Sequence, residues 1–226
     1  MLLIAFESSA KPASVAVLSS DNGTTKLLGQ YYQNNGFSHS RTLMEMAQSL
    51  TSNLGLGPSD FDLVAVANGP GSFTGVRIGV SAAKGLALGA DIPICGVSTL
   101  EAMAYQTPAD DIIICPVMDA RRGQLYNALF EWKNGSLTRL CQDRTISVYD
   151  LLSELGTYNK TFMPVGDGCD LVISKGQGTK LLVPYPLEKY QTAYGVALAA
   201  LNYESVSAAE LEPVYLRPSQ AERDKA

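Results

Sequence analysis

The segment between Asp62 and Ala90 constrains the fold of this chain more than any other. Its first part, Asp62–Ala67, is a short apolar run, which is typical of a strand covered on both faces. Asn68-Gly69-Pro70-Gly71 then predicts a sharp turn, because glycine tolerates positive φ and proline fixes its own φ. Ser72 or Thr74 can cap the helix that follows. The segment therefore predicts a buried strand, a tight loop and a packing helix.

A stripe of small residues runs along this predicted helix. Gly75, Gly79 and Ala83 stand at successive i+4 positions, so they share one face. Glycine costs about 1 kcal/mol relative to alanine inside a helix. Two glycines one turn apart therefore predict that another backbone packs closely against this face.

The glycine loop permits two interpretations. Its backbone N–H groups and the helix N-terminus could bind an anion such as phosphate. However, the lysine and following hydroxyl residue of a P-loop are missing, and so is the GxGxxG spacing. We favour a tight strand-to-helix turn, since the small-residue stripe accounts for more of the glycines.

Composition limits the functional classes. With 226 residues, 46% of them hydrophobic, the chain can bury a sizeable core. A net charge of −5 and a pI near 4.9 argue against autonomous nucleic-acid binding, so a partner should supply any basic surface for RNA.

The 4 cysteines form no CxxC pair and predict reduced thiols. No apolar run suits a signal peptide or a membrane span, so we expect a cytoplasmic protein without membrane association.

Hydrophobic patterning predicts two successive groups of elements. The first has strands near 2–6, 13–18 and 25–32, a helix from Ser38 or Ser40 to 54, the strand and helix described above, a strand at 94–97 and a helix through Tyr105. The second has strands at 111–118, 124–131 and 137–141, a helix at 148–155, a strand at 161–165, a loop-rich stretch at 166–178, a short strand at 181–183 and a last helix near 192–201. Each group begins strand–strand–strand–helix–strand–helix, which predicts an internal duplication with mixed sheets flanked by helices.

This βββαβα order resembles that of the actin, Hsp70 and sugar-kinase superfamily (ASKHA, RNase H-like). The resemblance implies an α/β fold with two actin-like lobes. We predict a first lobe at residues 1–105, which contains the partner-binding helices, and a second lobe at residues 106–226. The boundary is placed here because Gln106-Thr107-Pro108 is typical of a linker. The last helix is a candidate to pack back toward the first lobe.

Several motifs together resemble one family. They are NGPGSFTGVRIG at Asn68–Gly79, Ser38–Arg41, VMDARRGQ at Val117–Gln124 and EPVYLRP at Glu212–Pro218. These stretches are similar to the TsaB (YeaZ) family, the non-catalytic partner subunit in threonylcarbamoyladenosine modification of tRNA. Glu7-Ser8-Ser9 stands where that family commonly has Asp-Thr-Ser. Residues 140–210 match no motif of the family.

The resemblance implies a scaffold role. TsaD, the catalytic subunit, transfers threonylcarbamoyl to N6 of adenosine 37 in tRNAs that read ANN codons, and TsaE is an ATPase subunit that joins the pair. A TsaB-like chain would support TsaD, reach tRNA only through the complex, and form a homodimer when alone. No cofactor is expected. The alternatives from other classes are a small-molecule kinase or ATPase and a peptidase.

Two hairpins could carry chemistry. At the first, Glu7, Ser8 and Ser9 could hold a metal-bound water and touch phosphate, as in kinase-like relatives, but we favour a role in stabilising the turn. At the second, Arg121 and Arg122 could bind phosphate, since guanidinium groups match phosphate oxygens. A turn in which Asp119 pairs with Arg121 is an equally good interpretation.

His39 is the only histidine in the sequence. A single histidine is more often a hydrogen-bonded structural residue than a ligand, and it cannot complete the H-x-x-x-H metal motif of TsaD. A serine peptidase would need His39 as its base, but no GxSxG motif accompanies it. The sequence therefore predicts neither a metal site nor catalytic residues.

The resemblance also implies a partner surface on two helices. TsaB-like proteins pair through them, with a second copy or with TsaD in alternation, as a four-helix bundle. In this sequence the surface would comprise Ser40, Arg41, Met44, Thr74, Gly75, Arg77, Ile78, Gly79, Ala82 and Ala83. We expect the stripe of Gly75, Gly79 and Ala83 to let the facing helix approach closely.

Overall fold

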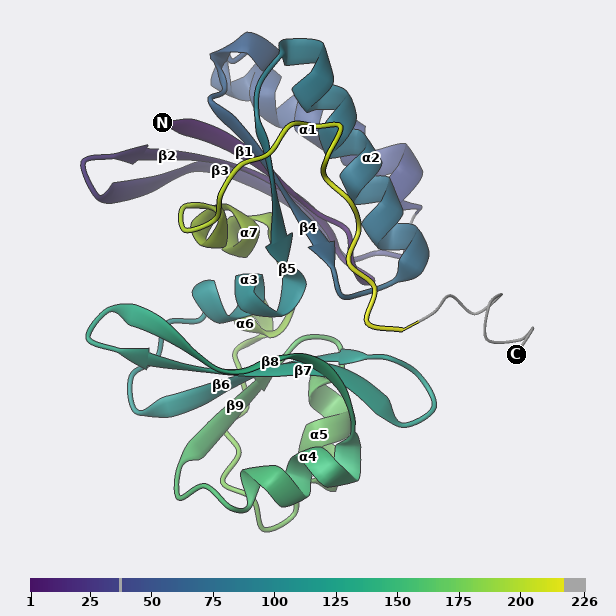
Figure 1. Cartoon of the computed structure of the whole chain (residues 1–226), viewed down its shortest axis with the longest axis vertical. Helices are drawn as coiled ribbons and strands as arrows, with labels where there is room; N and C mark the ends of the chain where they lie inside the picture. Colours follow the sequence, from purple (N-terminus) through teal and green to yellow (C-terminus); the bar gives the residue numbers. More distant parts are fainter. Residues whose placement is uncertain (37, 218–226) are drawn as a thin grey trace.

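Two β-sheets stacked one above the other form the framework of the molecule (Figure 1). The computed structural model describes residues 1–36 and 38–217, so Pro218 of the C-terminal motif lies outside the described residues. The five-stranded sheet has the order β3-β2-β1-β4-β5, and the four-stranded sheet has the order β8-β7-β6-β9.

The first sheet consists of β1 (Leu2–Glu7), β2 (Ala13–Asp21), β3 (Thr24–Gln33), β4 (Leu63–Gly69) and β5 (Ile94–Ser98). Strand β1 pairs antiparallel with β2 and parallel with β4. Helices α1 (His39–Leu54) and α2 (Phe73–Ala90) cover one face, and α3 (Thr99–Tyr105) and α7 (Ala193–Ala200) lie on the other (Figure 1). Successive residues of β1 alternate between these layers, as strand geometry requires: Ile4 packs with α1 and α2, whereas Leu3 packs with α7.

The second sheet consists of β6 (Ile112–Asp119), β7 (Gln124–Lys133), β8 (Ser136–Ser147) and β9 (Thr161–Val165). Helices α4 (Val148–Leu155) and α5 (Cys169–Lys175) cover the face that points away from the first sheet (Figure 1). The remaining elements are the short helix α6 (Pro186–Lys189) and a 3-10 turn at Pro58–Asp60. Within the described residues, no helix has the length and apolar character needed to cross a membrane.

The two sheets repeat one arrangement. In both, the third, second, first and fourth strands of the unit lie side by side in that order, with two antiparallel pairings and one parallel pairing. This confirms the predicted duplicated α/β fold with mixed sheets. All four cysteines are free in the structure.

Helix α3 belongs to the cores of both sheets. Leu100, Met103 and Ala104 pack against the second sheet, while Ala102 packs with α7 and the first sheet. Helix α7 comes late in the chain, yet its side chains join the core of β1 and β2. The division into lobes between residues 105 and 106 therefore stays a proposal, because the helix that ends at this point packs against both sheets.

The structure differs from the predictions mainly in the second half. Helix α5 lies within the stretch 166–178 that we predicted to be loop-rich. Its 7 residues make only about two turns, which offers little periodicity to detect. The predicted strand at 181–183 is only one bridge, between Phe162 and Leu181. Strand β8 continues six residues beyond the predicted end at Cys141, to Ser147.

Candidate functional site

The loop between β4 and α2 is shaped by close backbone contacts. A side chain on Gly71 would collide with the carbonyl oxygen of Ser9, and one on Gly69, at φ 130°, with that of Val214. The Ser72 amide donates a hydrogen bond to the Ser9 carbonyl at 2.6 Å, and the Ser72 hydroxyl caps α2 by accepting from the Gly75 amide. The loop therefore serves as a tight turn, and one amide that an anion would need is already bonded.

The small-residue stripe of α2 faces its own sheet, which corrects the predicted partner surface. Gly75, Gly79 and Ala83 are buried. A Cβ on Gly75 would collide with the Ser8 carbonyl oxygen, and one on Gly79 would lie 2.5 Å from the Ser8 hydroxyl. Close packing is thus confirmed, but the packed backbone is the β1–β2 turn and not a partner helix. The prediction that these three residues face outward and contact a partner is therefore wrong.

A groove of about 500 Å³ runs between the outer faces of α1 and α2. Most of the other residues predicted for the partner surface line it: Ser40, Met44, Thr74, Arg77, Ile78 and Ala82. The groove is completed by His39, Leu43, Phe73 and Ser81. Arg41 is exposed on α1 but does not line the groove.

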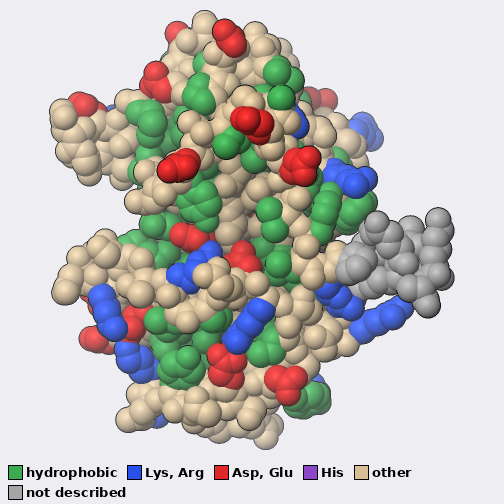
Figure 2. All heavy atoms as spheres, viewed as in Figure 1, with side chains coloured by type: hydrophobic (Ala, Val, Ile, Leu, Met, Phe, Trp, Pro, Cys, Tyr) green, Lys and Arg blue, Asp and Glu red, His purple; other side chains and the backbone are tan. Residues whose placement is uncertain are grey.

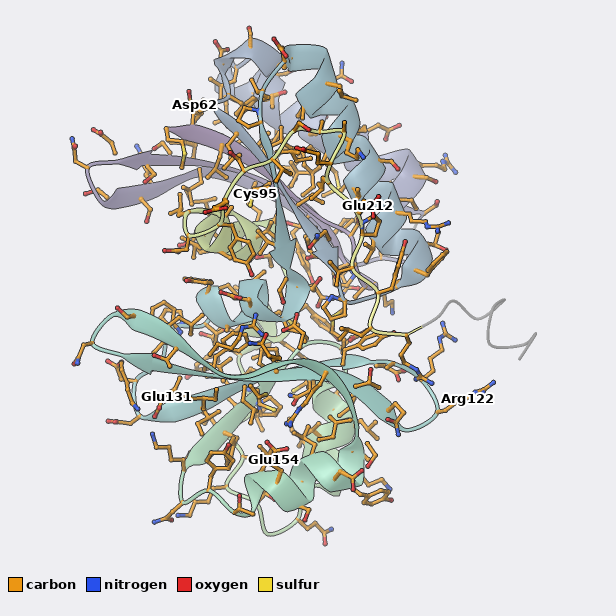
Figure 3. All side chains as sticks on the ribbon, in the orientation of Figure 1. Asp62, Cys95, Arg122, Glu131, Glu154 and Glu212 are labelled. Atoms are coloured by element: carbon orange, nitrogen blue, oxygen red, sulfur yellow. The ribbon has the colours of Figure 1, made fainter. Side chains whose placement is uncertain are left out.

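The C-terminal segment from Leu211 to Arg217 runs beside α2 and the glycine loop, as the position of Glu212 in Figure 3 shows. The Val214 amide donates to the Asn68 carbonyl at 2.7 Å, and the Lys84 ammonium donates to the Leu211 carbonyl at 2.9 Å. The Arg217 guanidinium then donates to the Ala120 carbonyl of the second half. The EPVYLRP motif therefore holds the glycine loop in place and connects it to the second hairpin.

Tyr215 on this segment completes a stacked cluster with two residues of α2. Its ring lies 4.8 Å from that of Phe73, and its hydroxyl accepts a hydrogen bond from Arg77 Nε at 2.9 Å. The Arg77 guanidinium carbon lies 3.9 Å from the centre of the Phe73 ring. Sequence analysis missed Phe73 and Tyr215 as site residues, although both lie in motifs that it had singled out.

A cleft of about 710 Å³ separates the two hairpins. It is lined from the first half by Ser9, Ala10, Lys11 and Gly71–Thr74, from the second half by Met118–Arg121, Tyr126 and Asp167, and from the C-terminal segment by Val214–Arg217. Of the predicted hairpin candidates, the cleft brings together only Ser9 and Arg121. Glu7 and Ser8 are buried behind it, and Arg122 points away into solvent (Figure 3). Nothing in the sequence analysis pointed to Asp167.

Glu7 is fully buried beneath the first hairpin. Burial raises its pKa to about 7, although Glu7 Oε1 accepts a hydrogen bond from the Ser9 amide at 2.6 Å. That bond closes the turn, which is the structural role we favoured. Glu7 Oε2 and the Ser9 hydroxyl have no hydrogen-bond partner among the described residues. Burial also raises the pKa of Asp167 across the cleft.

The second hairpin is held by its backbone. Arg121 and Arg122 both adopt left-handed conformations, at φ 66° and 58°. The Asp119 carboxylate accepts a hydrogen bond from the Arg121 amide at 2.7 Å, which stabilises this turn. The predicted ion pair between Asp119 and the Arg121 guanidinium is not found among the described residues. The carboxylate contacts the backbone instead.

His39 makes one structural hydrogen bond. Its Nε2 lies 2.7 Å from the Ala10 carbonyl oxygen, so this nitrogen carries the proton and donates it. The bond ties the start of α1 to the first hairpin. Within residues 1–36 and 38–217, no three His, Cys, Asp or Glu side chains are grouped to hold a metal ion.

Comparison with known proteins identifies the family. The family model described as "TsaD: tRNA N6-adenosine threonylcarbamoyltransferase" matches residues 34–215. The chain is 33% identical to the tRNA threonylcarbamoyladenosine biosynthesis protein TsaB of Bacillus subtilis, covering 98% of this chain and 96% of that protein. It is 27% identical to TsaB of Escherichia coli, with the same two coverages.

A solved structure shows the same fold. YeaZ from Pseudomonas aeruginosa superposes with a TM-score of 0.79 and 24% sequence identity, covering 95% of this chain and 99% of that chain. The full-length match to TsaB of Bacillus subtilis and the motifs of the glycine loop, the second hairpin and the C-terminal segment agree. The chain therefore belongs to the TsaB (YeaZ) family, within the broader group that the TsaD family model describes.

Proposed function

We propose that this chain takes part in threonylcarbamoyladenosine synthesis on tRNA as the non-catalytic subunit that binds TsaD in the cytoplasm. TsaD would transfer threonylcarbamoyl to N6 of adenosine 37 in tRNAs that read ANN codons, and TsaE would join as the ATPase subunit. The names of the TsaB relatives support the pathway. The scaffold role is our own inference from the surface described below.

The observation that carries the proposal is the groove between α1 and α2. The apolar side chains of Leu43, Phe73, Ile78 and Ala82 line it together with polar side chains, and Met44 is 45% exposed there. A groove lined by both apolar and polar side chains suits an amphipathic helix that lays its apolar face into it. Two helices that meet the helices of a partner would form a four-helix bundle.

Charge supports an indirect route to tRNA. The chain carries a net charge of −5, and acidic side chains predominate over the first sheet and its helices on the face drawn in Figure 2. A protein that binds tRNA without a partner normally presents a basic surface. We therefore expect the catalytic partner to supply the main tRNA-binding surface.

The proposal is tested by mixing the chain with TsaD and measuring the mass of the complex by light scattering. We expect a heterodimer, and we expect threonylcarbamoyl transfer to tRNA only when TsaD is present. If the homodimer uses the same groove, added TsaD should dissociate it. Modified adenosine formed by this chain alone, or no complex with TsaD, would overturn the proposal.

A second candidate function is nucleotide binding in the cleft. It is favoured by Lys11 and Arg121, two cations that line the cleft, and by the buried hydroxyl of the lining residue Ser9, which lacks a hydrogen-bond partner among the described residues. However, the carboxylates of Asp119 and Asp167 line the same cleft and would repel phosphate. Titrating the isolated chain with Mg-ATP in a calorimeter decides the matter, because a kinase or ATPase must bind the nucleotide alone.

A further inference from the structure

The side chain of Arg77 is held in a fixed position on the outer face of α2. Its guanidinium lies over the Phe73 ring at 3.9 Å and near the Tyr215 ring at 5.8 Å, and its Nε donates to the Tyr215 hydroxyl. We call Phe73, Arg77 and Tyr215 the Arg77 clamp. Because the clamp restrains a long side chain before any partner arrives, less conformational entropy is lost on binding.

The clamp leaves the strongest donors of Arg77 available. Among the described residues, only its Nε forms a hydrogen bond, and no carboxylate forms an ion pair with this guanidinium. The two terminal nitrogens can therefore form a bidentate pair with a carboxylate, the geometry that a planar guanidinium favours.

Among the described residues, no acidic side chain lines the groove beside the clamp and could pair with Arg77. Arg77 and His39 are the only titratable residues among those that line it. Glu45, the acidic residue of α1, lines a separate depression between α1 and β3 with Tyr31 and Tyr32. Among the residues that the structure describes, no carboxylate pairs with Arg77, so a molecule that docks in the groove can supply one.

We propose that TsaD presents a carboxylate to Arg77, and that this pair makes TsaD a better occupant of the groove than a second copy of this chain. The inference rests on the proposed function. A symmetric dimer formed through this groove would place the Arg77 of both copies in one interface, and the lining residues offer no acid to pair with either. Like charges that face each other across an interface oppose association, whereas opposite charges favour it.

The first experiment removes the charge with Arg77→Met. Truncating one partner of a desolvated charge pair should weaken TsaD binding by about 30-fold or more, measured by calorimetry. The homodimer, measured by sedimentation equilibrium, should be unchanged or tighter. Lys26→Met is the matched control, because it removes one positive charge from an exposed position on β3 that does not line the groove, and it should alter neither affinity.

The second experiment loosens the clamp while keeping the charge. Tyr215→Phe keeps the stacked ring and removes the hydroxyl that accepts from Arg77, so TsaD binding should weaken by a smaller factor, about 3-fold to 10-fold. The same substitution in the Arg77→Met background should have almost no further effect, because the two residues act through one contact.

The outcomes separate the inference from the proposed function. If the wild-type chain forms no complex with TsaD, the proposed function fails and the inference with it. If the wild-type chain binds TsaD and Arg77→Met binds equally well, or if Arg77→Met weakens the homodimer as much as the heterodimer, the inference alone is overturned. Circular dichroism of each variant establishes that the fold is kept.

Discussion

At the scale of single residues, backbone contact decides what each position of the glycine loop and of α2 tolerates. Gly79 faces the Ser8 hydroxyl and the Val66 side chain. Gly85 lies less than two turns further along the same helix, and a Cβ there would have no described heavy atom within 4 Å apart from the adjacent residues and backbone of its own helix. The two glycines have the same helix propensity, but Gly79 has close neighbours and Gly85 does not.

Substituting each of these glycines by alanine should therefore change stability in opposite directions. Gly79→Ala should lower the free energy of unfolding by about 1–3 kcal/mol, since the new methyl group overpacks the contact with Ser8. Gly85→Ala should raise it by about 0.5–1 kcal/mol through helix propensity. Urea denaturation of both variants checks this, and equal stabilisation of both would contradict the buried position of the stripe. Gly79→Leu, for the same reason, should damage the fold itself rather than a partner contact.

The buried carboxyl of Glu7 makes stability depend on pH. Its folded-state pKa is about 7 against an ordinary value of 4.5, so the unfolded chain loses its proton first as pH rises. The ionisation of Glu7 therefore lowers the free energy of unfolding. This loss is absent below about pH 4.5, grows up to about pH 7 and is constant above, on the order of 3 kcal/mol at most. Glu7→Gln should match the wild type at pH 4 and exceed its stability at pH 8. Denaturation series at the two pH values measure this, and parallel pH profiles would refute it.

At the scale of elements, α1 and α2 divide their faces between the core and the groove. The inner faces bury Leu43, Ala47 and Leu50 of α1 and the small-residue stripe of α2 against the first sheet. The outer faces carry Met44, Arg77 and Ile78. This separation means that surface substitutions in the groove can test docking without disturbing the fold.

Met44→Asp should weaken TsaD binding by about 10-fold or more, because it places an unpaired charge in the apolar part of the groove. Leu88→Asp is the control, since Leu88 is 65% exposed on α2 and does not line the groove. Calorimetric titration with TsaD compares the two. Equal losses in both variants would mean that the docking surface extends along the whole of α2 rather than following the groove.

At the scale of the whole molecule, α3 and an ion network join the two sheets. Arg139 of β8 pairs with Glu101 of α3 and with Asp143, and the Tyr203 hydroxyl donates to Glu101. Figure 2 shows acidic and basic side chains close together where the two halves meet. The Trp132 indole adds a hydrogen bond to the Ala104 carbonyl. Apolar packing and these polar contacts act on the same short helix.

Because both cores include α3, the chain should unfold in one cooperative transition. Scanning calorimetry should show one peak, with calorimetric and van't Hoff enthalpies equal. Arg139→Met leaves two partly buried carboxylates without their cation and should lower the free energy of unfolding by about 2 kcal/mol. Arg122→Met, at an exposed position, should leave it unchanged. Two separate transitions in the wild type would show that each half folds independently.

The sequence by itself determined the order of nearly all the elements and the duplicated fold. Hydrophobic periodicity and turn chemistry are local, so the strand and helix around Asn68-Gly69-Pro70-Gly71 could be predicted from neighbouring residues. The same local information predicted close packing at Gly75 and Gly79, but it did not determine which segment packs against them. A helix of one sequence can turn its small residues inward or outward without changing its periodicity.

Only the tertiary structure decided the site. The β1–β2 turn reaches Gly75 from 67 residues earlier in the chain, through the hydroxyl of Ser8. Tyr215 reaches Arg77 across 138 residues, and no pattern in either segment indicates the contact. Such contacts arise because the two sheets and the returning C-terminal segment bury apolar surface together, which depends on the whole chain. Sequence could therefore place residues on α2, but only folding determined which of them face the groove.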